Sequence, residues 1–216
     1  MGSRCAADFA LLATAPPWCF SQLAMPPTTA CVASRWVAMT TTRMGRLVED
    51  MLLLAKFDEQ RPLERQPVDL VILARDAVSD AKASTPHRPI ELVPGDSSVV
   101  VMGDNDRLRQ VIANVVSNAL VHTEADVAVT VTVGMTETEA TVAVSDSGEG
   151  MSADIAGHVT ERFFRSDPAR SRHRGGSGLG LAIVDAAVTA RGGAVSIASA
   201  EGTGTTVTIT LPRSDA

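Results

Sequence analysis

The sequence predicts a two-layer α/β sandwich, in which one sheet is covered on one face by helices. Two observations predict this fold class. Residues 104–123 carry apolar side chains at the spacing of a helix with one buried face. Residues 127–133 and 140–146 instead alternate apolar and small polar residues, with the period of two that is typical of half-buried antiparallel strands. Helices and strands with one apolar face each become stable by packing against one another.

The first sixty residues fall into two parts. Residues 1–40 contain several prolines and no regular period, so we assign them no fold. Residues 44–58 repeat apolar side chains at helical spacing and carry charged residues between them, which predicts an amphipathic helix that ends near Asp58, before Pro62.

The remaining elements follow Pro67 and are expected in a fixed order. Apolar periodicity predicts three helices, and short or alternating apolar runs predict the strands. The expected elements are a helix over 70–83, a strand near 99–102, a helix over 104–123, two strands around 127–133 and 140–146, a helix over 178–191, and a closing hairpin of 194–200 and 206–212.

Composition limits the function classes. A chain of 216 residues with 45% hydrophobic content can bury one sizeable core and a small appendage. Its net charge of −6 argues against a nucleic-acid partner, which would need a basic surface. We expect no direct membrane insertion, because no apolar run reaches the roughly 18 residues that a span requires. The three cysteines all precede residue 40 and form no disulfide framework, which favours a cytoplasmic protein.

Four motifs carry the chemistry. Asn114 and Asn118 lie one helical turn apart, so they share a face of the predicted helix, beside its apolar stripe. D-S-G-E-G at 146–150 places a carboxylate at a turn that glycine permits, G-G-S-G-L-G-L at 175–181 opens a helix, and G-T-G-T-T lies at 202–206. Glycines ahead of a helix N-terminus allow phosphate to approach the backbone N–H groups.

These four blocks, in this order, resemble the N, G1, G2 and G3 boxes of the sensor histidine kinase ATP-binding domain. That domain belongs to the superfamily that also contains gyrase, Hsp90 and MutL. The resemblance spans roughly residues 44–212 and implies a Bergerat-type ATP-binding fold that binds ATP with Mg²⁺. It also implies three regions: the irregular segment 1–40, a dimerisation-type helix (half of a hairpin) with a linker at 41–62, and the ATP-binding domain at 63–216.

The resemblance assigns roles to individual residues. Asp146 is the acceptor for the adenine amino group, and Asn118 is the metal ligand. Asn114 and Arg165 are the catalytic candidates; Asn114 stands where ATP-hydrolysing relatives carry a general-base glutamate, and an amide cannot take a proton. The residues implied in nucleotide binding are Asn114, Asn118, His122, Asp146, Gly148, Gly150, Phe164, Gly176, Gly178, Leu179, Gly180 and Thr205.

Three features of the expected site leave alternatives open. The basic run 165–174 is either a mobile lid over the phosphates or an ordinary solvated loop. His122 either contacts the nucleotide or is a surface or capping group. Val121 departs from the family pattern, because many relatives have Lys or Arg there against the phosphates; valine either lowers the activity or is compensated by an arginine of the run 165–174.

A complete histidine kinase carries its phosphoacceptor histidine on the helix that precedes the segment at 43–58. The four histidines of this sequence, His87, His122, His158 and His173, all follow that segment. We therefore expect the catalytic half of a split kinase, whose partner is a separate histidine-containing dimerisation protein and whose phosphoryl group reaches a response regulator indirectly. The alternatives are a standalone ATPase, an anti-sigma-type serine kinase, and a nucleotide-binding pseudokinase that acts as an interaction module.

Overall fold

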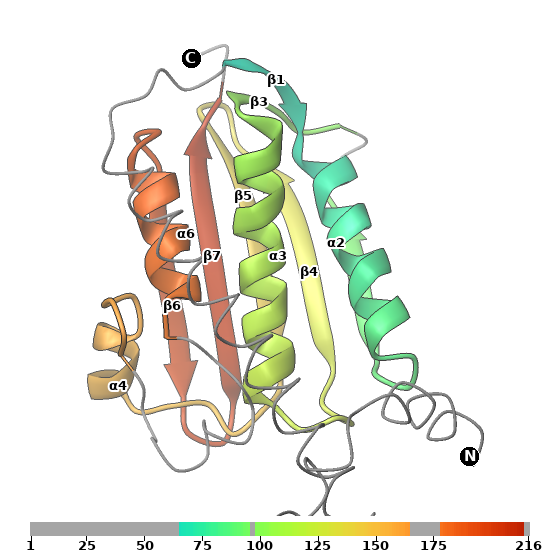
Figure 1. The fold of residues 1–216 in the computed structure, drawn as a ribbon, viewed down its shortest axis with the longest axis vertical. Coiled ribbons are helices and arrows are strands. Elements are labelled where there is room, and N and C mark those ends of the chain that lie inside the picture. The colour runs from blue at the N-terminus through green and yellow to red at the C-terminus, as the bar shows by residue number, and fades with distance from the viewer. Residues whose placement is uncertain (1–64, 96–97, 165–177, 214–216) are drawn as a thin grey trace, which may run out of the picture. The chain divides into compact units, whose positions relative to one another are not determined.

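The computed structural model describes residues 65–95, 98–164 and 178–213 (Figure 1). The irregular segment 1–40, the amphipathic helix expected at 44–58 and the basic run 165–174 lie outside the described residues. None of the helices in the described ranges is long and apolar enough to span a bilayer.

A five-stranded sheet forms one layer of the domain. Its strand order is β2 (Ile90–Pro94), β4 (Val129–Met135), β5 (Glu139–Asp146), β7 (Gly204–Pro212) and β6 (Ala194–Ala200). The pairs β4–β5, β5–β7 and β6–β7 are antiparallel, whereas β2 is parallel to β4. The four antiparallel strands confirm the two hairpins predicted from alternation.

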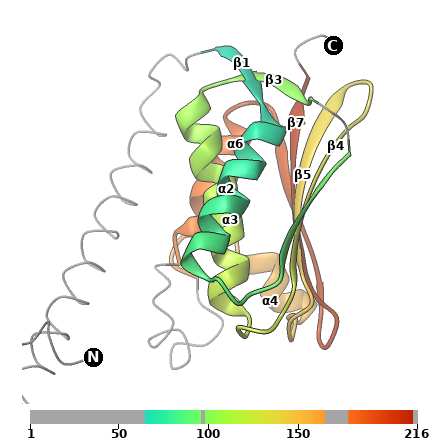
Figure 2. The ribbon, with the colours of Figure 1, turned by 90° about the vertical axis from the view of Figure 1, so that its right-hand side faces the viewer.

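Three helices form the second layer, and they all lie on the same face of the sheet (Figure 2). They are α2 (Leu70–Ser84), α3 (Asn105–His122) and α6 (Gly180–Thr189), with α3 packed against both of the others. The predicted two-layer α/β sandwich is therefore confirmed, and each of the three predicted helices is present with shifts of one or two residues at its ends.

The core lies between the two layers. Strand residues with the period of two face the helices and are almost fully buried, as Val131, Val142 and Ile209 show. From α3, Leu108, Ile112 and the valines at 111, 115 and 116 reach the same core. Burial of this kind stabilises a fold by roughly 25 cal/mol per Å² of apolar surface. The alternation in the sequence therefore fixes which face of each strand meets the helices.

Some elements differ from the sequence-based expectation. The strand predicted near 99–102 is present as β3 (Val100–Gly103), but it pairs with β1 (Gln66–Asp69) in a separate two-stranded sheet. The strands β1 and β2 and the short helix α4 (Ala153–His158) were not predicted. Both strands are short and contain a proline, and α4 buries none of its residues, so none of them produces a clear apolar period.

The carboxylate of Asp69 caps the start of α2. Its Oδ1 accepts from the Val71 N–H at 2.8 Å, and its Oδ2 accepts from the Ser98 hydroxyl at 2.9 Å. Burial by itself would raise the pKa of Asp69, but hydrogen bonds from Ser98 and from nearby backbone N–H groups outweigh it and lower the pKa below 3.8. The charged form stabilises the fold, and this contribution is lost as pH falls through the lowered pKa.

Candidate functional site

The motifs singled out in the sequence gather at one end of the domain. The last turn of α3, the end of β5 and the turn between β6 and β7 all lie there, and the start of α6 points toward the same end (Figure 1). Strand register accounts for part of this gathering, because Asp146 at the end of β5 stands opposite Val129 on one side and Thr205 on the other. Four distant stretches of sequence therefore lie at or point toward one end of the domain.

Two backbone N–H groups orient the carboxylate of Asp146. Its Oδ1 accepts from Gly148 at 3.0 Å and from Thr205 at 3.3 Å. The carboxylate is half-buried, and it remains able to accept a further hydrogen bond because each of its oxygens has two acceptor positions. An oriented carboxylate of this kind suits recognition of an amino group on a planar base.

Glycines allow the turn after β5 to approach the turn between β6 and β7. Gly150 has φ +65°, and a Cβ there would lie 2.0 Å from the carbonyl oxygen of Ala200. Gly204 has φ +96°, and a Cβ there would lie 2.0 Å from the carbonyl oxygen of Asp146. The two turns are also joined by a hydrogen bond from the Gly202 N–H to the Glu149 carbonyl, at 2.7 Å. The structure thus brings the predicted G1 and G3 boxes into contact.

Ser199 links these two turns through its hydroxyl. The hydroxyl accepts from the Met151 N–H at 2.9 Å, donates to the Gly204 carbonyl at 3.0 Å, and lies 2.9 Å from the hydroxyl of Thr205. Thr205 is 9% exposed, so its hydroxyl is held inside the site rather than in solvent. Ser199 was not predicted, because an isolated serine in a strand of small residues gives no signal.

Asn114 and Asn118 stand at the edge of the α3 core face, as their spacing predicts. Both are half-buried, while Val115 and Ala119 beside them are buried in the core. The side-chain nitrogen Nδ2 of Asn114 is buried and has no hydrogen-bond partner among the described residues. A buried donor without a partner is costly, so this amide fits a ligand or a water that supplies an acceptor.

The start of α6 is suited to an anion. The capping position is Leu179, whose fully buried side chain has no oxygen to accept from the first N–H groups of the helix. Gly178 has φ +71°, and among the described residues no atom lies within 4 Å of where a Cβ on Gly180 would be. Open space beside backbone N–H groups at a helix N-terminus allows a phosphate to approach them.

The last residues before the undescribed segment pack against α4. The Phe163 N–H donates to the Gly178 carbonyl at 3.0 Å. This hydrogen bond joins the described residues that precede and follow the segment 165–177. The ring of Phe164 lies 5.9 Å from that of His158. A hydrogen bond to Glu161 and the charge of that residue raise the pKa of His158. Phe164 therefore belongs to this small surface cluster.

The predicted site residues are distributed as follows. Asn114, Asn118, Asp146, Gly148, Gly150, Gly178, Leu179, Gly180 and Thr205 lie on the elements that converge at this end. His122, the last residue of α3, is exposed there. Arg165 and Gly176 lie outside the described residues.

Arg88 was not predicted, although it is buried beside this site. It is 8% exposed and precedes β2 in the stretch T-P-H-R-P-I, which resembles an ordinary polar loop. The signal that sequence reasoning could have used is weak: a single arginine between two prolines, next to a strand.

Comparison with known proteins assigns the domain to a family. The family model of histidine kinase-, DNA gyrase B-, and HSP90-like ATPases matches residues 103–215, which includes every motif described above. The probable sensor histidine kinase TcrY of Mycobacterium tuberculosis is 47% identical over 160 residues, which are 74% of this chain and 34% of TcrY. The chain spans about a third of the length of the curated relatives that it matches.

Solved structures agree with this assignment. The mycobacterial sensor histidine kinase MprB has 29% sequence identity and a TM-score of 0.60, over 68% of this chain and 97% of that one. Full-length ShkA in complex with AMPPNP has 25% identity and a TM-score of 0.72, over 89% of this chain and 40% of that one.

The close contact of the two glycine turns can be tested by a matched pair of substitutions. Gly202 and Gly204 both have positive φ, but a Cβ on Gly202 would meet nothing within 4 Å. We expect Gly202→Ala to lower the free energy of unfolding by about 1–2 kcal/mol, the cost of a left-handed backbone. Gly204→Ala adds the clash with Asp146 and should cost roughly 3 kcal/mol or more. Urea unfolding measures both, and equal losses would contradict the contact.

Proposed function

The chain belongs to the family of histidine kinase-, DNA gyrase B-, and HSP90-like ATPases, and we propose that it is a protein-histidine kinase subunit. In this proposal it binds Mg-ATP at the end of the domain where α3, β5 and the β6–β7 turn meet. It then transfers the γ-phosphoryl group to a histidine on a separate protein, from which the group passes to a response regulator. The observation that carries the proposal is the Asp146 carboxylate, which two backbone N–H groups hold at the end of the domain where α3 also ends.

Adenine recognition is the role proposed for Asp146. A carboxylate can accept a hydrogen bond from the adenine amino group, whereas guanine presents a carbonyl at the same position. Because Gly148 and Thr205 fix the orientation of Oδ1, the carboxylate does not need to reorganise when a base binds. The hydroxyl of Thr205, on the adjacent strand β7, is close enough to contribute to the same base pocket.

Asn118 is the residue proposed to hold magnesium. Its amide oxygen is a hard donor of the kind that Mg²⁺ prefers, and an octahedral ion at this position would take its other ligands from phosphate and water. The described residues contain no cluster of three or more His, Cys, Asp or Glu side chains that could hold a metal. We propose that the metal arrives with the nucleotide, because the phosphates supply oxygen ligands that a single amide does not. When bound, it would neutralise charge on the phosphates.

Asn114 suits phosphotransfer better than hydrolysis. Its amide cannot take a proton from water, so attack by water gains no general base from this residue. Its buried Nδ2 can instead donate to a phosphate oxygen, which supplies the partner that the described residues do not provide. The start of α6 offers further N–H groups to the phosphates. These residues bind and orient the γ-phosphoryl group, which is most of what its transfer requires.

The acceptor is proposed to come from another polypeptide. An imidazole nitrogen of the partner's histidine would attack the γ-phosphorus while the bond to the bridging oxygen breaks, and ADP leaves. The four histidines of this sequence all lie at position 87 or later, within or beyond the ATP-binding domain. The apolar repeat at residues 44–55 lies outside the described residues, but its helical spacing is what such a partner would require, by analogy with the dimerisation hairpin that it resembles. Two-component signalling in the cytoplasm is the setting that we propose.

Nucleotide binding tests the site itself. We expect Asp146→Asn and Asn118→Ala each to weaken Mg-ATP binding about ten- to a hundredfold, because each removes one charge-assisted or metal-linked contact worth ~1.5–3 kcal/mol. Calorimetric titration of the folded variants measures this. Asp80→Asn and Ser117→Ala are the control variants, since both residues are exposed and neither has a role in the proposed site. Wild-type affinity in both site variants would show that the nucleotide binds elsewhere.

Phosphotransfer tests the activity. Incubated with labelled ATP, this protein should acquire no stable label, because its own histidines lie outside the acceptor pattern. Addition of histidine-bearing dimerisation proteins from the same genome should produce acid-labile label on one of them. The controls are Asp146→Asn in this chain and loss of the acceptor histidine in the partner.

The outcome of this assay separates the alternatives. Acid-labile label on this chain incubated alone would contradict transfer to a separate protein. Acid-stable label on a partner's serine would instead support an anti-sigma-type kinase. Nucleotide binding without transfer to any candidate would support the pseudokinase alternative.

A further inference from the structure

We infer that Arg88 is a positioning residue for the nucleotide site, which joins the last turn of α3 to the turn that carries Asp146. This inference rests on the proposed function, because it concerns how the two halves of the proposed ATP site are held together. No motif of the sequence analysis contains Arg88, and its role follows from its contacts.

Arg88 directs its guanidinium into the end of α3. Its Nη1 donates to the Leu120 carbonyl at 2.9 Å, and its Nη2 lies 3.4 Å from the Ala119 carbonyl. The last carbonyl groups of a helix lack partners within the helix and carry partial negative charge, so a cation there is favourable. The planar fork of arginine can bind two adjacent carbonyls at once, which lysine cannot reproduce. Arg88 therefore fixes the turn that contains Asn118.

The same guanidinium also holds the loop that leads into β4. Its Nε donates to the Val127 carbonyl at 3.2 Å. Two residues later, Val129 begins β4 and stands opposite Asp146 on β5. A hydrogen bond from the Ser147 N–H to the Ala128 carbonyl, at 3.4 Å, continues this connection to the residue after Asp146.

Thr123 provides the second connection between Arg88 and the Asp146 turn. Its hydroxyl accepts from Arg88 Nη2 and donates to the Ala119 carbonyl at 2.6 Å. Its methyl group packs directly over Gly148, where an added Cβ would lie 2.6 Å from Cγ2. Gly148 is in turn one of the two donors to Asp146 Oδ1. A shift of Thr123 would therefore be transmitted to the carboxylate through one glycine.

The charges around Arg88 also favour its position beside the Asp146 turn. Burial lowers the pKa of Arg88, while the carboxylates of Asp146 and Asp126 oppose that effect and favour the charged form. Arg88 thus carries its positive charge close to the carboxylate that we assign to adenine recognition. A neutral residue at position 88 would leave carbonyl groups at the end of α3 without this donor.

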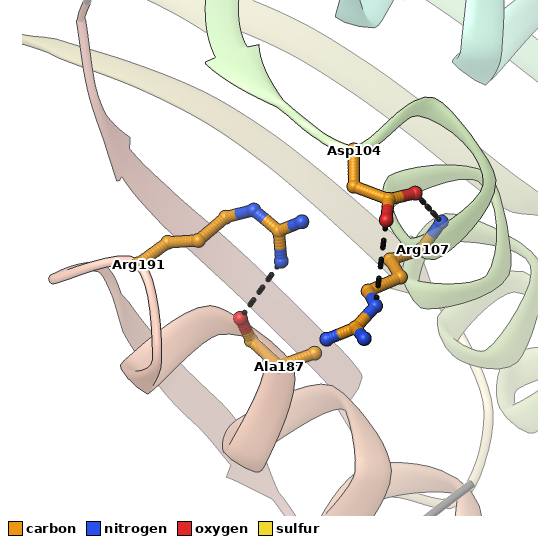
Figure 3. Close-up of polar contacts among 4 residues, drawn as sticks. All are labelled: Asp104, Arg107, Ala187 and Arg191. Carbon is orange, nitrogen blue, oxygen red and sulfur yellow. Dashed lines mark hydrogen bonds and ion pairs between the residues drawn. The ribbon is translucent and has the colours of Figure 1, made fainter. Parts of the chain in front are cut away.

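Arg191 provides a matched comparison at the other end of the domain. It is a half-buried arginine just after the C-terminus of a helix, and its Nη1 donates to the Ala187 carbonyl of α6 at 3.2 Å. Figure 3 shows it beside Asp104 and Arg107, at the start of α3. Burial lowers the pKa of Arg191, and the charge of Asp104 acts in the opposite direction. Arg191 lies near Leu211 and Pro212, far along β7 from Thr205.

The experiment compares Arg88→Lys and Arg191→Lys in the full chain. Calorimetry gives the affinities for Mg-ADP and Mg-GDP, and thermal unfolding gives the stability. Arg88→Lys should weaken Mg-ADP binding roughly tenfold and reduce the preference for adenine over guanine, because the carboxylate is displaced. Arg191→Lys should lower the melting temperature but leave both affinities within about twofold of the wild type.

A double-mutant cycle tests whether Arg88 affects nucleotide binding through the Asp146 turn. If Arg88 acts through the Asp146 turn, Arg88→Lys should cost less than about twofold in Mg-ADP affinity when Asp146→Asn is already present. Thr123→Val keeps the methyl group over Gly148 but loses the hydroxyl, and it should reproduce part of the loss. It also replaces Arg88→Lys as the test if the lysine variant does not fold.

Three outcomes of these experiments would overturn the positioning role of Arg88. Folded Arg88→Lys or Thr123→Val protein with wild-type affinity and wild-type base preference would overturn the positioning role while leaving the proposed function intact. Equal loss of adenine preference in Arg191→Lys would also overturn it, because the effect would then be general destabilisation. Wild-type protein that binds neither nucleotide would overturn the proposed function, and this inference with it.

Discussion

The register between β5 and β7 is the constraint on which the site depends. The two strands pair continuously from Glu139 opposite Pro212 to Asp146 opposite Thr205. A slip of one strand by one residue would turn its buried apolar side chains away from the helices, so the buried face enforces the register. The same register places the Thr205 N–H against the Asp146 carboxylate. Hydrophobic burial in the middle of the sheet thus fixes a polar contact at its end.

In the helix layer, too, the burial of an apolar face fixes the position of polar site residues. The apolar face of α3 is buried against the sheet and the neighbouring helices, which fixes the rotation of the helix about its axis. Asn114 and Asn118 are then held at the edge of that face, whatever their own interactions contribute. Among the described residues the Nδ2 of Asn114 has no hydrogen-bond partner, as expected of a position that serves a ligand rather than stability.

Sequence reasoning recovered the parts of the fold that produce a strong period. The three helices and four antiparallel strands carry apolar residues at regular spacing, and the sequence displays that spacing directly. The parallel strand β2 was missed because it is short, ends at Pro94 and gains its pairing from a strand some forty residues later in the chain. Long-range pairing of this kind leaves no local signal.

The candidate site likewise contains residues that could be predicted from the sequence and residues that could not. Asp146, Gly148 and Thr205 belong to glycine motifs whose chemistry can be inferred from residue type and spacing. The contact of the two turns through Gly150 and Gly204 could not be predicted from the sequence, because it depends on how two hairpins meet in the folded domain. Arg88 could not be predicted, because its function comes from carbonyl groups at the end of a helix some thirty residues away.

We propose that an adenine nucleotide binds between the Asp146 turn and the last turn of α3. Amide NMR spectra of the full chain, recorded during a titration with Mg-ADP, locate the bound nucleotide. We expect large shifts for the amides of Gly148 and Thr205, the two donors to Asp146, and small ones for Gly193 and Arg213 at the opposite end of the sheet. Shifts concentrated at Gly193 and Arg213, or no shift at millimolar Mg-ADP, would contradict it.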